Sequence, residues 1–360
     1  MLRAKLILNL SLNQLLNKTT MPEESIEHID FNDLNRRAIS KPLVKHIYTA
    51  DPSAHVFEGK IYIYPSHDID TDIPFDDLGS HFAMEDYHVI SLDGPDGEAT
   101  DHGIALHIKD VHWAEKQMWA PDAACKNGKY YLYFPAKNKD GIFQIGVAIG
   151  DSPAGPFLAE PLAIENSYSI DPAVFADEDG KHYMYFGGIW GGQLQSYRDN
   201  TYNADYSEPL PGQAALGLRM ALLTDDMKQF AEPVREIIIT DENGHPLLAG
   251  DNERRFFEAS WVHKYNGKYY FSYSTGDTHF ICYAIGDNPY GPFIYQGRIL
   301  NPVVGWTSHH SICAFNDKWY LFYHDSSLSK GITHLRSIKV TELTYDGTGR
   351  IQTIDPYRKE

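Results

Sequence analysis

Short stretches in which apolar and polar residues alternate occur in pairs along the chain, with a turn between the two members of each pair. The first pair, YTADPSAHVFEGKIYIYPSHD, runs from Tyr48 to Asp68 and turns at Glu58 and Gly59. Alternation with a period of two is typical of β-strands that bury one face, and a turn rich in Gly, Asn or Asp between two such strands is typical of a hairpin. The pattern therefore predicts a β-hairpin over this stretch.

The same plan returns four more times, and each copy begins with a polar residue and resumes after its turn with a lysine. The polar residues at the heads of the five copies are Asp51, Asp122, Asp171, Glu258 and His309, and the lysines are Lys60, Lys129, Lys181, Lys268 and Lys318. A single hairpin cannot bury its apolar face, whereas several hairpins packed radially can, as in a propeller. We therefore predict an all-β fold, a five-bladed β-propeller.

In a propeller, the innermost strands of all blades begin around the central axis at one end. The five polar head residues are thus expected to converge there, although they are far apart in the sequence. Any one of them alone would be interpreted as a turn or capping residue, which is a common role of aspartate. Five equivalent positions that all carry Asp, Glu or His favour a functional cluster instead.

The motifs ADPSAHVF, MWAPD, SIDPAVFADEDGK, FEASWVHKYNGKYY and HHSICAF, in this order, resemble glycoside hydrolase family 43, whose members are five-bladed propellers that act on xylans and arabinans. The resemblance extends from about Tyr48 to Gly349. It implies that Asp51 is the general base, that Asp171 orients the base and tunes pKa values, and that Glu258 is the general acid of an inverting reaction. One departure is the alanine after the glutamate in FEAS, where many members carry glycine or proline.

The chemistry of glycoside cleavage sets requirements on two of these acids. One carboxylic acid protonates the leaving oxygen, and one carboxylate activates water or attacks carbon. Glu258 should therefore have a raised pKa, for which Phe256, Phe257 and Trp261 could supply an apolar environment, while Asp51 should stay ionised. The sequence does not fix the distance between the two groups, which decides between inversion and retention.

Further residues are candidates for binding substrate. The resemblance places His67, Asp68 and Arg336 close to the pocket, and a guanidinium offers several fixed donors to sugar hydroxyls. Trp119 could stack on a sugar or fill the core. Neighbouring residues of a strand point to opposite faces, so one of His309 and His310 should face the axis while the other packs. The predicted substrate-binding residues are Trp119, His67, Asp68, Arg336 and His310.

His309 is also a candidate metal ligand, because the resemblance places a histidine at this position near an axial, mostly water-ligated Ca²⁺ ion. A hard cation prefers oxygen ligands, so one imidazole and waters would make a weak site that acts as electrostatic support. The alternative is that His309 hydrogen-bonds a substrate hydroxyl or a catalytic acid. A Ca²⁺ ion or another divalent cation is therefore one of two open interpretations.

The net charge and the cysteines of the chain limit the classes of partner and the cellular location that we expect. With 31 Lys and Arg against 49 Asp and Glu, the net charge of −18 argues against nucleic acid or an anionic membrane as a partner and suits a neutral oligosaccharide. Cys125, Cys282 and Cys313 have no CxxC spacing and are interpreted as buried free thiols, which favours a cytoplasmic location. A periplasmic or secreted location is the alternative if residues 1–20 act as a signal. The oligomeric state is left open.

We expect residues 1–40 to form an N-terminal extension with a loose lead-in over 23–40, and residues 41–360 to form a single five-bladed propeller catalytic domain. Two long insertions, 69–114 and 190–255, should edge the pocket. The leading hypothesis is an inverting exo-acting β-xylosidase or α-L-arabinofuranosidase that releases pentoses from xylan- or arabinan-derived oligosaccharides. The alternatives are an endo-acting arabinanase or xylanase and a non-catalytic carbohydrate-binding propeller.

Overall fold

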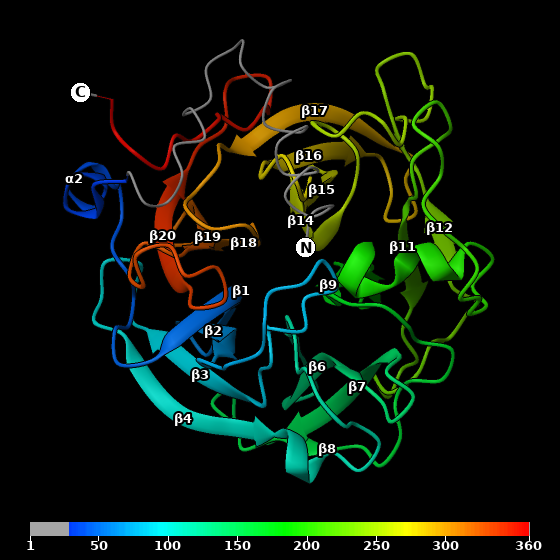
Figure 1. Ribbon diagram of the computed structural model, residues 1–360, viewed down its shortest axis with the longest axis horizontal. Coiled ribbons are helices and arrows are strands. Elements are labelled where there is room, and N and C mark those ends of the chain that lie inside the picture. The colour runs from blue at the N-terminus through cyan, green and yellow to red at the C-terminus, as the bar shows by residue number, and fades with distance from the viewer. Residues whose placement is uncertain (1–28, 360) are drawn as a thin grey trace.

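A computed structural model of the protein describes residues 29–359, which form five sheets arranged around a central axis (Figure 1). The first sheet contains β1 (Tyr48–Phe57), β2 (Lys60–Asp68), β3 (Asp86–Leu92) and β4 (Thr100–His107). The second contains β5 (Asp122–Lys126), β6 (Lys129–Lys137), β7 (Phe143–Gly150) and β8 (Leu158–Ala159). The third contains β9 (Ala173–Ala176), β10 (His182–Phe186), β11 (Leu218–Leu222) and β12 (Arg235–Ile237).

The fourth sheet contains β14 (Glu258–Tyr265), β15 (Lys268–Ser274), β16 (Ile281–Gly286) and β17 (Phe293–Leu300), and the short β13 (Ile239–Thr240) pairs parallel to its outer edge. The fifth contains β18 (His310–Phe315), β19 (Lys318–Asp325) and β20 (Ser337–Leu343). The helical segments are α2 (Phe31–Arg37), η2 (Ile108–Asp110), η3 (Trp190–Gly192) and η4 (Leu194–Tyr197). The predicted five-bladed β-propeller is confirmed, with β1, β5, β9, β14 and β18 innermost.

The turns of the inner hairpins explain why the repeat carries Gly, Asn or Asp there. In the first blade Phe57 pairs with Lys60, so Glu58 and Gly59 form a two-residue loop with φ values of 52° and 79°. Such loops need positive φ at both positions, which glycine and asparagine adopt most readily. The second, fourth and fifth blades have the same two-residue loop, whereas in the third blade Ala176 pairs with His182 across a longer loop.

Buried tyrosines join successive blades. Tyr64, Tyr133 and Tyr185 stand four residues after the lysine of their repeat, and all three are fully buried. Their hydroxyl groups donate hydrogen bonds to backbone carbonyls in the next blade, those of Pro153 (2.7 Å), Met227 (2.9 Å) and Pro289 (2.8 Å) respectively. Each tyrosine thus buries a large apolar ring while its polar atom stays paired. These three tyrosines therefore belong to the core.

The segment before β1 closes the ring by running beside the last blade. The backbone amide of Leu43 donates to the carbonyl of Ile338 in β20 (2.8 Å), and Ile39 donates to Pro356 near the C-terminus (3.0 Å). The expectation of a loose lead-in is wrong over α2, because Asp30 caps this helix and Leu34 is buried. Residues 1–28 of the predicted extension lie outside the described residues.

The three cysteines are free, as predicted, with Cys282 and Cys313 buried and Cys125 partly exposed. Over residues 29–359, no helix has both the length and the apolar character needed to cross a membrane.

Candidate active site

A pocket at one end of the propeller axis brings together four of the five residues that head the repeats. Asp51, Asp171, Glu258 and His309 all line it. Asp51 lies within β1, and the other three lie at or just before the start of an innermost strand. The fifth, Asp122, is buried below the pocket and accepts hydrogen bonds from Ser53, His55 and the backbone amide of Val174, so it ties three blades together. The predicted convergence is therefore found for the two aspartates, the glutamate and the histidine.

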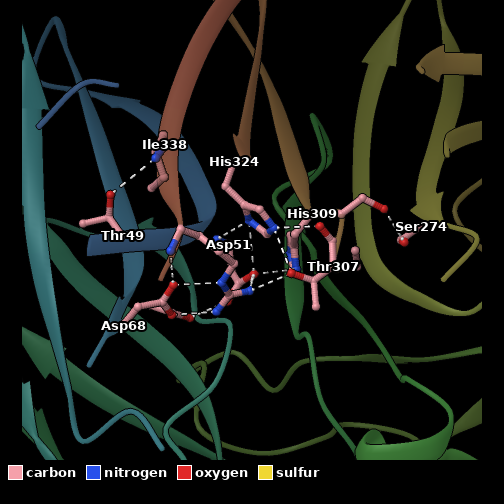
Figure 2. Close-up of polar contacts among 12 residues, drawn as sticks. Thr49, Asp51, Asp68, Ser274, Thr307, His309, His324 and Ile338 are labelled. Atoms are coloured by element: carbon pink, nitrogen blue, oxygen red, sulfur yellow. Dashed lines mark hydrogen bonds and ion pairs between the residues drawn. The ribbon is translucent and has the colours of Figure 1, made fainter. Parts of the chain in front are cut away.

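Asp51 lies at a bulge in β1, where the backbone adopts a φ of 51° and turns the carboxylate toward the axis. Ser66 donates to its Oδ2 (2.7 Å) and Arg336 to its Oδ1 (2.9 Å). Figure 2 shows Asp51 among its neighbours Asp68, His309 and His324. Burial alone would raise the pKa of Asp51, but Arg336, His309 and His324 outweigh it and lower the pKa to about 2. Asp51 is therefore ionised across the neutral pH range.

The guanidinium of Arg336 is held in place mainly by Asp68. Its Nε and Nη2 donate to the two carboxylate oxygens of Asp68 (2.8 and 2.7 Å), while Nη1 donates to Asp51 and to Thr307. A guanidinium has five N–H donors, so these contacts leave one for a ligand. Arg336 lines the pocket as predicted, but most of its donors position Asp51.

Whereas Asp51 lies in the first blade, Glu258 is the first residue of β14, in the fourth blade. Burial, followed by the negative charge of Asp51, raises its pKa to about 8. Of the three aromatic residues predicted to surround it, only Phe257 lines the pocket. Phe256 and Trp261 are buried in the core between blades and shape the glutamate's environment only indirectly. Glu258 is therefore protonated at neutral pH and can donate a proton.

Asp171, just before β9, also lines the pocket and interacts with the charges of both acids. Its Oδ2 accepts a hydrogen bond from the backbone amide of Ala259 (2.7 Å), the residue after Glu258, where φ is 62°. Burial, then the charges of Glu258 and Asp51, raise the pKa of Asp171 well above its ordinary value. Because this hydrogen bond fixes the backbone at Ala259, Asp171 helps to set the position of the neighbouring glutamate.

This arrangement predicts how the variant Asp171→Asn will behave. An amide keeps the size of the carboxylate but is a weaker acceptor for the backbone amide of Ala259, so Glu258 should be held less firmly and kcat should fall at neutral pH. The alkaline limb of the profile of kcat/KM against pH should stay near pH 8, because burial and Asp51 raise the pKa of Glu258. A kcat close to that of the wild type would contradict a role for Asp171 in positioning Glu258.

The two adjacent histidines point to opposite sides, as expected. His309 lines the pocket, and its Nδ1 lies 3.7 Å from Asp51 Oδ1 and 3.9 Å from Asp171 Oδ2. Burial lowers its pKa to about 4, so the ring is neutral. His310 is fully buried and shares a hydrogen bond of 2.6 Å with Ser272, which rules it out as the predicted substrate contact.

Of three other residues predicted to bind substrate, Trp119 lines the pocket, whereas Asp68 and His67 do not. Trp119 lines the pocket, with its indole N–H bonded to the carbonyl of Phe82 (2.8 Å). Asp68 is fully buried behind Arg336, so its predicted contact with substrate is corrected to a positioning contact. His67 does not line the pocket either, because it turns toward Asp86 on β3 (Nδ1 to Oδ1, 2.7 Å).

Several residues in the pocket wall or in contact with Asp51 have no motif in the sequence that marks them. Trp190 and Trp306 stack with ring centroids 5.9 Å apart and form part of the pocket wall. His324 accepts a hydrogen bond from the backbone amide of Asp51 (3.0 Å), although it lies at the far end of β19. Only Trp306 could have been suspected, because it stands three residues before His309 and so must lie near the same end of the axis.

The two insertions contribute to the pocket wall as expected. The first supplies Asp77, Gly79, Phe82 and Met84, and the second supplies residues 190–192. The remainder of each insertion builds outer strands, including β3 and β4 in the first and β11 and β12 in the second. The pocket therefore has an apolar and aromatic wall around three carboxyl groups, of which Asp51 is ionised and Glu258 is protonated at neutral pH, and this arrangement suits acid–base chemistry on a sugar.

The family model of Glycosyl hydrolases family 43 matches residues 100–351. A protein from Humicola insolens named "Xylosidase/arabinosidase 43A" is 63% identical over 324 residues, covering 88% of this chain and 99% of that protein. A solved GH43 β-xylosidase/α-arabinofuranosidase from a compost microbial metagenome, in complex with xylotriose and in a calcium-free form, is 66% identical with a TM-score of 0.88, covering 89% of this chain and 98% of that one. A GH43_1 enzyme from Xanthomonas citri, complexed with xylotriose, is 61% identical with a TM-score of 0.88, covering 92% and 98%.

The propeller, the paired acids on its axis and these similarities lead to one conclusion. This chain belongs to glycosyl hydrolases family 43.

Proposed function

We propose that the protein is an inverting, exo-acting glycoside hydrolase that releases single pentoses from xylan- or arabinan-derived oligosaccharides. The observation that carries this proposal is the pair of carboxyl groups with opposed pKa values, about 2 for Asp51 and about 8 for Glu258, in one pocket. Pairs of acids whose environments drive their pKa values apart are typical of glycosidases. The relatives named xylosidase/arabinosidase support a pentose as the substrate.

In the proposed mechanism, Glu258 donates its proton to the glycosidic oxygen as the bond to the anomeric carbon breaks. Asp51 accepts a proton from a water molecule, whose oxygen attacks the anomeric carbon from the opposite face. The products are a sugar of inverted configuration and a free hydroxyl on the leaving group, and both acids then exchange protons with solvent. Arg336 keeps Asp51 ionised, and Asp171 keeps Glu258 in position.

Exo action is supported by the two insertions, because their residues Gly79, Phe82 and Trp190 wall the pocket. A non-catalytic binding propeller is disfavoured, since burying three carboxyl groups together lowers the stability of the fold and a binding module does not need them.

The test is release of p-nitrophenol from the β-xyloside and from the α-L-arabinofuranoside, measured side by side. Release from either supports the proposal. Inactivity on both, with cleavage of polymeric arabinan or xylan, would replace it with the endo-acting alternative.

A Ca²⁺ ion near His309 is the second part of the proposal. A similar solved enzyme is described as a calcium-free form, which implies that enzymes of this family can bind calcium. The donors available on the axis are the neutral His309 ring and the nearby oxygens of Asp51 and Asp171, which lie beyond hydrogen-bond distance from its Nδ1. This set suits a cation held largely by water, whose charge would help keep Asp51 ionised.

Chelation tests the calcium proposal. After prolonged dialysis against a chelator, kcat should fall, and added Ca²⁺ should restore it. The circular dichroism spectrum should not change, because the propeller core does not depend on the axial site. Full activity after elemental analysis has verified metal removal would reject the cofactor and leave His309 as a neutral neighbour of the acids.

A further inference from the structure

A second group of potential metal ligands lies on the first blade, away from the pocket. It consists of His67 on β2 with Asp86 and His88 on β3, and the ligand atoms of these three residues lie within 4.8 Å of one another. The three side chains are 18%, 11% and 11% exposed, so the group is sheltered but reachable from solvent. None of the three lines the active-site pocket.

The hydrogen bonds of His88 orient its ring as in a metal ligand. Its Nδ1 lies 2.8 Å from Asp101 Oδ1 on β4, an oxygen that also accepts from the backbone amide of Gly103 (2.8 Å). Donation from Nδ1 to this anchored carboxylate leaves the lone pair of Nε2 on the side of Asp86, whose Oδ1 is 3.9 Å away. Histidine ligands of metals usually donate their other ring N–H to a carboxylate in this way.

His67 and Asp86 complete the set. The Nδ1 of His67 shares a proton with Asp86 Oδ1 at 2.7 Å, and its ring centroid lies 4.7 Å from that of His88. A metal ion in place of this proton would take one nitrogen from each histidine and one carboxylate oxygen. Small movements of the side chains would bring all three atoms to the bond lengths of about 2.0–2.2 Å that Zn²⁺ requires.

We propose that His67, Asp86 and His88 form a binding site for a borderline divalent transition metal such as Zn²⁺, with Asp101 orienting His88. Two imidazole nitrogens and one carboxylate oxygen favour Zn²⁺, Co²⁺ or Ni²⁺ over Ca²⁺, which prefers an all-oxygen shell. Water supplies the fourth ligand. The ion links β2 to β3 beside Asp68, the residue that holds Arg336, and so stabilises the first blade.

The two imidazole nitrogens of this site favour Zn²⁺ over Ca²⁺, so an experiment in excess Ca²⁺ distinguishes it from the proposed axial calcium site. The full-length protein, without an affinity tag, is stripped with chelator and titrated with Zn²⁺ by calorimetry in excess Ca²⁺. The wild type should bind Zn²⁺ at this site, and its Tm should rise on binding. His88→Asn, which keeps a donor for Asp101, should lose one equivalent of Zn²⁺ and the rise in Tm. Asp101→Asn should weaken the affinity about 10- to 100-fold.

His102→Asn is the matched control, because His102 lies on β4 of the same blade and pairs with Ser91 (2.8 Å) outside the group. This variant should bind Zn²⁺ as the wild type does. Zinc-edge X-ray absorption of the wild type should show two imidazoles in the metal shell, a readout that needs no variant to fold. Absence of Zn²⁺ binding, unchanged stoichiometry in His88→Asn, or a shell without imidazole would each overturn the proposal.

Discussion

Replacing Asp51 by asparagine is expected to lower kcat on an aryl β-xyloside or α-L-arabinofuranoside by about 10²-fold or more, because the amide cannot accept a proton from water. The asparagine side chain would keep the size of the aspartate, its Oδ1 could still accept from Arg336, and its Nδ2 could donate to the hydroxyl of Ser66, which now donates to the carboxylate. The fold should therefore survive, and steady-state kinetics with circular dichroism and Tm measurements would separate loss of catalysis from loss of structure.

Asp177→Asn provides the control for this variant. Asp177 is also a well-bonded carboxylate in a repeat hairpin, but it pairs with Lys264 (3.0 Å) and Tyr269 rather than with pocket residues. Its replacement should change stability and leave kcat unchanged. If Asp51→Asn retained nearly wild-type kcat while folded, Asp51 would have no part in the chemical step.

Glu258→Gln is expected to have an effect of similar size, because it removes the proton donor for the leaving group. The loss should be about 10²-fold or more on xylo-oligosaccharides, whose alkoxide leaving groups need protonation, and much smaller on aryl glycosides with acidic phenols. Kinetics on a series of leaving groups would show this as a steep dependence of kcat/KM on phenol pKa in the variant.

The pH profile gives an independent check on Glu258. The group acts in its protonated form and its pKa is raised to about 8, so kcat/KM of the wild type should fall as pH rises through about 8. In Glu258→Gln this limb should disappear, since the amide does not titrate. An equal loss on all leaving groups, with the alkaline limb intact, would assign the proton donor to another residue.

The repeat pattern was enough to predict the fold and the convergence of the acids. Alternating strands and Gly, Asn or Asp turns indicate hairpins, and five hairpins with Asp, Glu or His in the same position place those side chains around one axis. The head residue of each hairpin is fixed by strand register, which is a local property. For this reason Asp51, Asp171, Glu258 and His309 could be located from the sequence.

Contacts between side chains of different blades could not be predicted in the same way. Asp68 was expected at the substrate but lies buried behind Arg336, because the guanidinium of the fifth blade reaches across to β2. His310 was expected in the pocket, yet the backbone directs it toward Ser272. His324 had no signal at all, since its contact with Asp51 depends on how the first and fifth blades meet.

The central claim is that water, activated by Asp51, attacks the face opposite the bond whose oxygen Glu258 protonates. Proton NMR of the hydrolysis of a β-xyloside tests it most directly, because the anomeric signals of the first product appear before mutarotation mixes them. Inversion predicts that α-xylose appears first. If β-xylose appeared first, the reaction would retain configuration, and Asp51 would act as a nucleophile rather than as a general base.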